Sequence, residues 1–161
     1  MTGSLEWNGE HDELDLADAQ RQQVTHVWKY EVVANDFAKA GAASTDAKKK
    51  MKEIGLPADI VRRAAVAIYE GEINMVIHAN GGEITITVDD GSILMVLADR
   101  GPGIGDVGKA MEAGFSTAQE NVRNLGFGAG MGLPNMKKYT DELFVDSKQG
   151  KGTTVTMRIY R

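Results

Sequence analysis

The sequence contains no cysteine, which excludes disulfide bonds, thiolate metal sites and a cysteine nucleophile. It also lacks an apolar run of membrane-spanning length, and its acidic N-terminus, MTGSLEWNGEHDELD, is unlike the basic and then apolar start of a secretory signal. We therefore expect a cytoplasmic protein that does not contact a membrane. The 161 residues, of which 42% are hydrophobic and 25% charged, suit one globular core.

An excess of basic charge is also missing. The chain has 18 basic and 23 acidic residues, and residues 1–25 hold six of the acids against one base, Arg21. Those six acids are Glu6, Glu10, Asp12, Glu13, Asp15 and Asp18. The rest of the chain is neutral, so direct binding of nucleic acid through phosphate neutralisation is not expected. We expect an acidic N-terminal arm over residues 1–25 and one domain over residues 26–161.

Glycine, by contrast, is abundant. Nine of the 19 glycines fall between Gly101 and Gly132. Such a density indicates a backbone that repeatedly adopts positive φ or closely approaches another group. We therefore place the functional site in this part of the sequence.

Residue patterns predict alternating helices and strands. β-branched and alternating apolar residues predict strands over residues 26–34, 83–88, 92–98, 143–147 and 153–160. The turn Asp89-Asp90-Gly91 makes a hairpin of the second and third strands. Apolar periodicity and helix-start residues predict helices over residues 36–53, 57–80, 107–113 and 131–139.

The second of these helices carries a polar row. At 100° per residue, Glu70, Asn74 and His78 lie along one face. A partly buried carboxylate at Glu70 could act as a general base. Glu72 points away from the row and is expected to be a solvated surface charge. From this helix alone, the polar edge of an amphipathic helix explains the row equally well.

The segment DRGPGI at residues 99–104 directly follows an apolar strand. Its two glycines let the backbone pass close to a planar ligand, and Asp99 can accept a hydrogen bond from an exocyclic amine such as that of adenine. A structural alternative is that Asp99 pairs with a basic residue or caps the next turn.

The segment GFGAGMGL at residues 126–133 leads into a predicted helix. Alternating glycines before a helix leave amide N–H groups free for an anion, and phosphate is the natural ligand. A flexible hinge is the alternative. A Walker A loop over residues 103–109 is rejected because Ala110 stands where a Mg²⁺-binding Ser or Thr is needed. A dinucleotide-binding loop is likewise not expected.

Together these segments resemble the Bergerat ATP-binding (GHKL) family, which includes gyrase, histidine kinases and MutL. The row from Glu70 to His78 looks like its N-box, residues 99–103 look like its first glycine box and residues 126–132 like its second. Gly152-Thr153 resembles the glycine-threonine pair that supports the adenine-binding aspartate. The run from residue 114 to 155 most resembles the bacterial anti-sigma-factor serine kinases and the switch kinases of stress-response relays. The resemblance covers residues 26–161.

The resemblance implies an α/β two-layer sandwich, with helices on one face of a mixed, mostly antiparallel sheet. It implies ATP and Mg²⁺ as cofactors, Glu70 as the general base and Asn74 as the Mg²⁺ ligand. A lid over residues 105–125 is implied, in which the contact of Lys109 or Arg123 with the γ-phosphate stays open. The other implied nucleotide-binding residues are His78, Asp99, Gly101, Gly103, Ile104, Gly126, Gly128, Ala129, Gly130, Met131, Gly132 and Thr153.

Three functions follow from the resemblance. The first is a serine/threonine protein kinase that phosphorylates a small antagonist protein of the STAS type. The second is a non-catalytic, ATP-dependent binding switch that sequesters a sigma factor or activates a phosphatase. The third is a detached histidine-kinase catalytic domain or a gyrase-type ATPase. Glu70 argues against the histidine kinase, because histidine kinases commonly have Asn at that position. The oligomeric state, including a homodimer, stays open.

Overall fold

The computed structural model describes residues 25–103 and 132–161. Its strands are β1 (His26–Val32), β2 (Gly82–Val88), β3 (Ser92–Asp99), β4 (Glu142–Lys148) and β5 (Gly152–Tyr160). Its helices are the 3-10 helix η1 (Phe37–Lys39) and the α-helices α2 (Ala42–Glu53), α3 (Ala58–His78) and α6 (Gly132–Tyr139). The acidic arm, the lid and the helix predicted over residues 107–113 lie outside the described residues.

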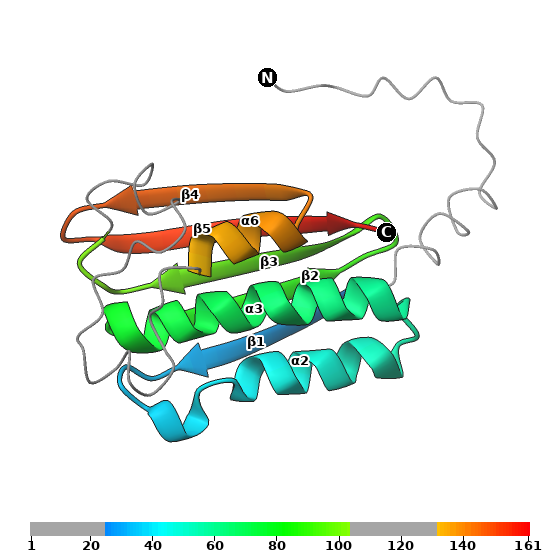
Figure 1. Ribbon diagram of the computed structural model, residues 1–161, viewed down its shortest axis with the longest axis horizontal. Helices are drawn as coiled ribbons and strands as arrows, with labels where there is room; N and C mark the ends of the chain where they lie inside the picture. Colours follow the sequence, from blue (N-terminus) through cyan, green and yellow to red (C-terminus); the bar gives the residue numbers. More distant parts are fainter. Residues whose placement is uncertain (1–24, 104–131) are drawn as a thin grey trace, which may run out of the picture.

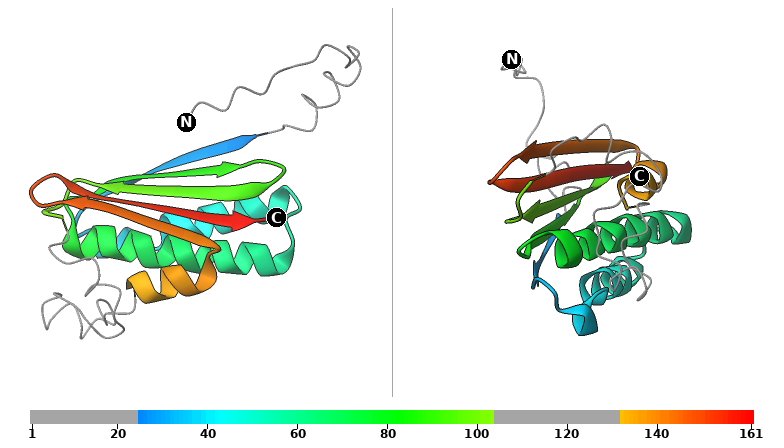
Figure 2. Two further views of the ribbon diagram at one scale, coloured as in Figure 1. Left: turned by 90° about the horizontal axis from the view of Figure 1, so that it is seen from above. Right: turned by 60° about the vertical axis from the view of Figure 1, so that its left-hand side comes forward.

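The five strands form one sheet in the order β1-β2-β3-β5-β4 (Figure 1). All four pairings are antiparallel, so the described sheet contains no parallel pair. The views in Figure 2 place α2, α3 and α6 together on one face of it. The predicted two-layer α/β fold is therefore confirmed.

The β2–β3 hairpin shows how alternation builds the core. Asp89 closes its turn, because one carboxylate oxygen accepts hydrogen bonds from the backbone N–H groups of Gly91 and Ser92, each 2.8 Å long. Successive strand residues point to opposite faces, and one set is fully or almost fully buried beneath the helices. That set is Ile84, Ile86, Val88, Ile93, Met95 and Leu97.

The first predicted helix begins later than residue 36. Asp36 caps only the short helix η1, accepting a hydrogen bond from the N–H of Lys39 at 3.3 Å. Gly41 then adopts a left-handed conformation with φ 93°, and α2 starts at the next residue. A Cβ atom at Gly41 would lie 3.3 Å from the ring of Tyr69. The left-handed turn and the close contact both favour glycine, so the chain breaks there instead of continuing as one helix.

The prediction that Glu72 is a solvated surface charge is wrong. Glu72 is only 2% exposed, because α2 packs against the side of α3 opposite the polar row. The two Glu72 carboxylate oxygens accept hydrogen bonds from the N–H groups of Ala43 and Ser44, each 3.1 Å long. Glu72 therefore caps the N-terminus of a neighbouring helix, a task that Gly41 cannot perform with a side chain.

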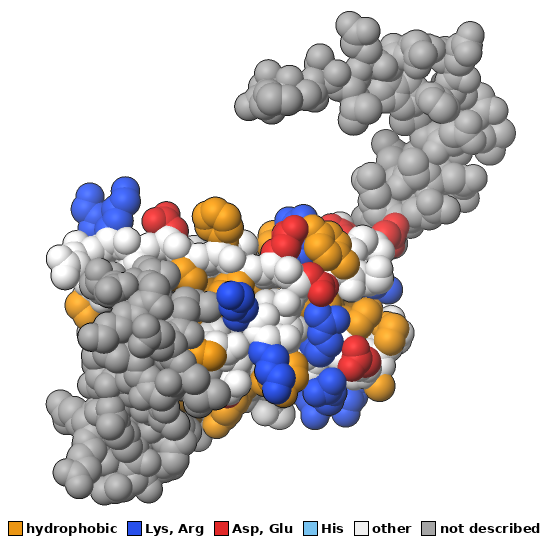
Figure 3. Space-filling view, turned by 45° about the horizontal axis from the view of Figure 1, so that its top comes forward, with side chains coloured by type: hydrophobic (Ala, Val, Ile, Leu, Met, Phe, Trp, Pro, Cys, Tyr) orange, Lys and Arg blue, Asp and Glu red, His pale blue; other side chains and the backbone are white. Residues whose placement is uncertain are grey.

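The surface of the described part is chemically mixed. On the face in Figure 3, basic and acidic side chains both occur, with apolar and neutral groups between them. Phe144 and Val27, on the two edge strands, are 76% and 53% exposed. None of the described helices has the length and apolar character needed to cross a membrane.

Candidate functional site

The polar row on α3 lies at the boundary between core and solvent. Glu70, Asn74 and His78 are each partly buried. Burial raises the pKa of Glu70, and a hydrogen bond from Asn135 partly opposes this rise. Burial lowers the pKa of His78, which favours its neutral form. The row therefore presents a carboxylate that is more basic than an exposed one, beside two neutral polar groups.

Helix α6 runs antiparallel to α3 along this row. Its first residue, Gly132, is so close to Asn74 that an added Cβ would lie 2.6 Å from the amide nitrogen. One turn later, the Asn135 amide nitrogen donates a hydrogen bond to Glu70 Oε1 at 3.1 Å. At the far end, Arg63 Nε donates to the carbonyl of Tyr139 at 3.1 Å. These contacts fix the start of α6 against Asn74. The second glycine-rich segment leads into this start.

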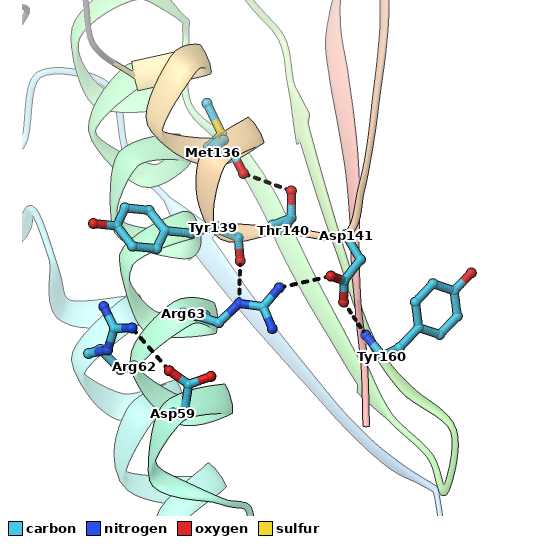
Figure 4. A network of polar contacts seen from close by, with 8 residues as sticks. All are labelled: Asp59, Arg62, Arg63, Met136, Tyr139, Thr140, Asp141 and Tyr160. Carbon is cyan, nitrogen blue, oxygen red and sulfur yellow. Dashed lines mark hydrogen bonds and ion pairs between the residues drawn. The ribbon is translucent and has the colours of Figure 1, made fainter.

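A second contact of Arg63 ties α6 to the sheet, as Figure 4 shows. Arg63 Nη2 lies 3.0 Å from Asp141 Oδ1, and Asp141 Oδ2 accepts a hydrogen bond from the N–H of Tyr160 at 2.8 Å. The side chain of Arg63 is only 23% exposed. One guanidinium group therefore joins α3, the end of α6 and the segment that leads into β4.

We expect Arg63→Ala to destabilise the domain by about 1 to 2 kcal/mol, because it leaves the Tyr139 carbonyl and Asp141 without their shared donor. Urea unfolding measures this change. Arg62→Ala is the matched control, since Arg62 and its partner Asp59 are 59% and 67% exposed and should contribute less than about 0.5 kcal/mol. Equal losses in the two variants would contradict a special role for Arg63.

The carboxylate of Asp99 is held in a fixed orientation at the end of β3. Its Oδ1 accepts hydrogen bonds from the N–H groups of Gly101 and Thr153, both at 2.9 Å. Within the described part of the chain, Oδ2 has no hydrogen-bond partner. One oxygen is thus used for positioning, and the other is left to accept a hydrogen bond.

Backbone groups crowd around Asp99 because three neighbouring residues are glycines. A Cβ at Gly101 would lie 2.8 Å from the Cα of Ala79, the residue that follows α3. At Gly103 and Gly152, where φ is +82° and +94°, a Cβ would meet the carbonyl oxygens of Lys148 and Asp99. The first glycine box therefore joins the end of α3 to the β4–β5 turn, which brings Asp99 to the same end of the fold as the polar row.

Sequence reasoning missed two features of this site. Asn135 contacts Glu70. The sequence gives only a weak indication of this contact, a polar residue after Pro134 in the first turn of α6. Gly82 lies opposite Asp99 in the β2–β3 register, and a Cβ there would meet the Ala98 carbonyl. The glycine pair at residues 81–82 is explained from sequence only as a helix stop.

Only part of the predicted site falls within the described residues. Of the predicted nucleotide-binding residues, those beyond the described ranges are Ile104, Gly126, Gly128, Ala129, Gly130 and Met131. Among residues 25–103 and 132–161, no group of three or more His, Cys, Asp or Glu side chains could hold a metal ion. The described site is thus a carboxylate, an amide and an imidazole on α3, with a second carboxylate at the end of β3.

Residues 33–159 match the family profile of the histidine kinase-like ATPase domain. The chain belongs to this family. It is 36% identical over 108 residues to the serine/threonine-protein kinase RsbT of Bacillus subtilis, covering 65% of this chain and 75% of RsbT. It is 40% identical over 99 residues to an anti-sigma F factor of Caldanaerobacter subterraneus subsp. tengcongensis. That match spans 58% of this chain and 66% of the relative, slightly less than two thirds of its length.

A solved structure shows the same fold. The crystal structure of the RsbU and RsbW domains of Rv1364c from Mycobacterium tuberculosis matches 84% of this chain and 33% of that one, with a TM-score of 0.57 and 16% identity. The resemblance to the GHKL family and its anti-sigma-factor kinases is therefore confirmed, and with it the expectation of an ATP-binding domain.

Proposed function

We propose that this protein is an ATP- and Mg²⁺-dependent serine/threonine kinase that phosphorylates a small, STAS-type antagonist protein in the control of a bacterial sigma factor. The observation that carries this proposal is the half-buried Glu70, which lies one turn from Asn74 and has its carboxylate held by Asn135. The similarity to a kinase named RsbT and to proteins named anti-sigma F factor supports the reaction class and the type of partner.

In this proposal the adenine base is recognised by Asp99. The Oδ2 atom accepts a hydrogen bond from the adenine amino group, while Gly101 and Thr153 hold Oδ1. Gly101, Gly103 and Ile104 line the base in this arrangement. Gly101 and Gly103 carry no side chain, so a flat ligand can approach their backbone closely.

The phosphates belong beside Asn74 and the start of α6. The amide oxygen of Asn74 is a suitable Mg²⁺ ligand, because phosphate oxygens already supply negative charge to the ion. When bound, Mg²⁺ would neutralise charge on the transferred phosphoryl group. Gly132, together with residues 126–131, would donate backbone amides to the phosphates. His78, one turn beyond Asn74, would be a further polar group beside the phosphates, in its neutral form.

Glu70 has the chemistry of a general base in this arrangement. Its burial favours proton uptake, and among the described residues Asn135 occupies one of its two carboxylate oxygens and no residue occupies the other. The other oxygen is available to take the proton of a serine or threonine hydroxyl as it attacks the γ-phosphate. Positioning and charge neutralisation by the surrounding groups would supply the rest of the catalysis.

The decisive experiment mixes the protein with γ-labelled ATP, Mg²⁺ and each candidate antagonist from the same genome. The proposal expects transfer of label to one serine or threonine, located by mass spectrometry. A second function, a non-catalytic ATP-dependent switch, is favoured by the name of the Caldanaerobacter relative. ATP-dependent capture of a sigma factor, with no label transferred to any antagonist, would overturn the kinase proposal in favour of the switch.

We expect Asp99→Asn to lower ATP affinity tenfold or more. The variant keeps the side-chain shape but can place an amide donor opposite the adenine amine, which costs about 1 to 3 kcal/mol. Calorimetry with ATP and GTP measures the effect, and the wild-type protein should prefer ATP. Asp89→Asn, in the turn at the opposite end of β3, is the matched control and should bind ATP normally. Equal binding of ATP and GTP by the wild-type protein would contradict adenine recognition by Asp99.

A further inference from the structure

The contact between Asn135 and Glu70 joins two helices at the proposed reaction centre. The two residues are 65 positions apart in sequence, and the donor–acceptor distance is 3.1 Å in a part-buried setting. The bond is directional, because an amide nitrogen can only donate and an ionised carboxylate can only accept. Within the described residues, no other hydrogen bond to the Glu70 carboxylate is present.

A glutamate side chain has three rotatable torsions, so a general base on a helix surface needs an external contact to fix its direction. The hydrogen bond at Oε1 removes this freedom and leaves Oε2 unoccupied among the described residues. The Asn135 backbone is itself fixed, because α6 is anchored to α3 at both ends, by Gly132 against Asn74 and by Tyr139 on Arg63.

We infer that Asn135 is a positioning residue that orients the Glu70 carboxylate for proton abstraction and couples it to the helix that starts at the phosphate-binding segment. This inference rests on the proposed kinase function. It adds a residue that acts through Glu70 and touches neither ATP nor the substrate hydroxyl. Its expected signature is therefore an effect on turnover that exists only while Glu70 is a carboxylate.

The test is a kinetic double-mutant cycle on the full chain with ATP, Mg²⁺ and the antagonist that accepts phosphate. Asn135→Ala should lower kcat by roughly tenfold to a hundredfold and leave the KM for ATP within about twofold of the wild-type value. In a Glu70→Gln background, Asn135→Ala should have no further effect on kcat. Asn135→Asp should be worse than the alanine variant, because it places a second carboxylate beside the first. Lys137→Ala, an exposed position on the same helix, is the control.

A second measurement does not depend on activity. In ¹³C NMR spectra, the side-chain carboxyl carbon of Glu70 should shift on Asn135→Ala and stay unchanged on Lys137→Ala. An unchanged Glu70 resonance, or an equal loss of kcat in both backgrounds, would overturn the positioning role. If the wild-type protein transfers no phosphate at all, the kinase proposal fails instead, and the NMR comparison still decides whether Asn135 orients Glu70.

Discussion

Glu70→Gln is expected to reduce phosphoryl transfer by roughly 10²- to 10⁴-fold while leaving ATP affinity unchanged. Glutamine keeps the size of the side chain, and its amide oxygen can still accept the hydrogen bond from Asn135. It cannot take up a proton from a serine or threonine hydroxyl. Single-turnover transfer to the antagonist and calorimetry with ATP measure the two quantities separately.

Asn74→Ala is the contrasting control, because it removes the proposed metal ligand and should weaken Mg²⁺-ATP binding itself. The pH dependence adds a further check. Because burial raises the pKa of Glu70, the wild-type rate should increase with pH through a pKa above that of an exposed glutamate. Glu70→Gln should lose this acidic limb. If Glu70→Gln transfers phosphate at the wild-type rate, general-base catalysis by Glu70 is wrong.

Helical geometry explains why the polar row could be found from sequence. Residues four positions apart lie on one face of any α-helix, so Glu70, Asn74 and His78 share a side of α3 whatever surrounds them. The β2–β3 hairpin could be predicted in the same way, from apolar residues that alternate along each strand. Both features depend on neighbours along the chain, and these are visible in one sequence.

Contacts between distant segments could not be found in this way. Nothing near Asp99 in sequence indicates the Thr153 N–H that holds it, and only the family resemblance connected the two. The contact of Asn135 with Glu70 depends on the antiparallel register of α6 on α3. That register is fixed by Arg63, Tyr139 and Asp141, whose roles appear only in three dimensions.

Glu72 shows the same limit most sharply. The helical wheel correctly placed it opposite the row, but a wheel does not tell what lies on each side of a helix. A local signal does exist, because α2 begins at Gly41-Ala42 without a capping side chain. Amide N–H groups at a helix start need acceptors when they are buried. When a helix without a capping side chain lies beside a helix that carries a glutamate, the glutamate is therefore expected to be buried against the uncapped N-terminus.

Glu72→Ala should consequently lower the free energy of unfolding by about 3 kcal/mol, since it removes two charge-assisted hydrogen bonds and leaves buried amides at Ala43 and Ser44 without acceptors. For a domain of this size, such a loss lowers Tm by roughly 6 to 12 °C. Urea unfolding and thermal melts measure it.

Two variants separate the buried cap from a general effect of lost charge. Glu53→Ala removes an exposed acid near the end of α2 and should change stability by less than about 0.5 kcal/mol. Glu72→Gln should be intermediate, because its single amide oxygen can accept from only one side while its NH₂ group faces the second backbone N–H. A Glu72→Ala protein as stable as Glu53→Ala would show that the α2 N-terminus does not depend on this carboxylate. If stability falls in the order Glu53→Ala, Glu72→Gln, Glu72→Ala, the cap works through both oxygens, as the paired 3.1 Å contacts imply.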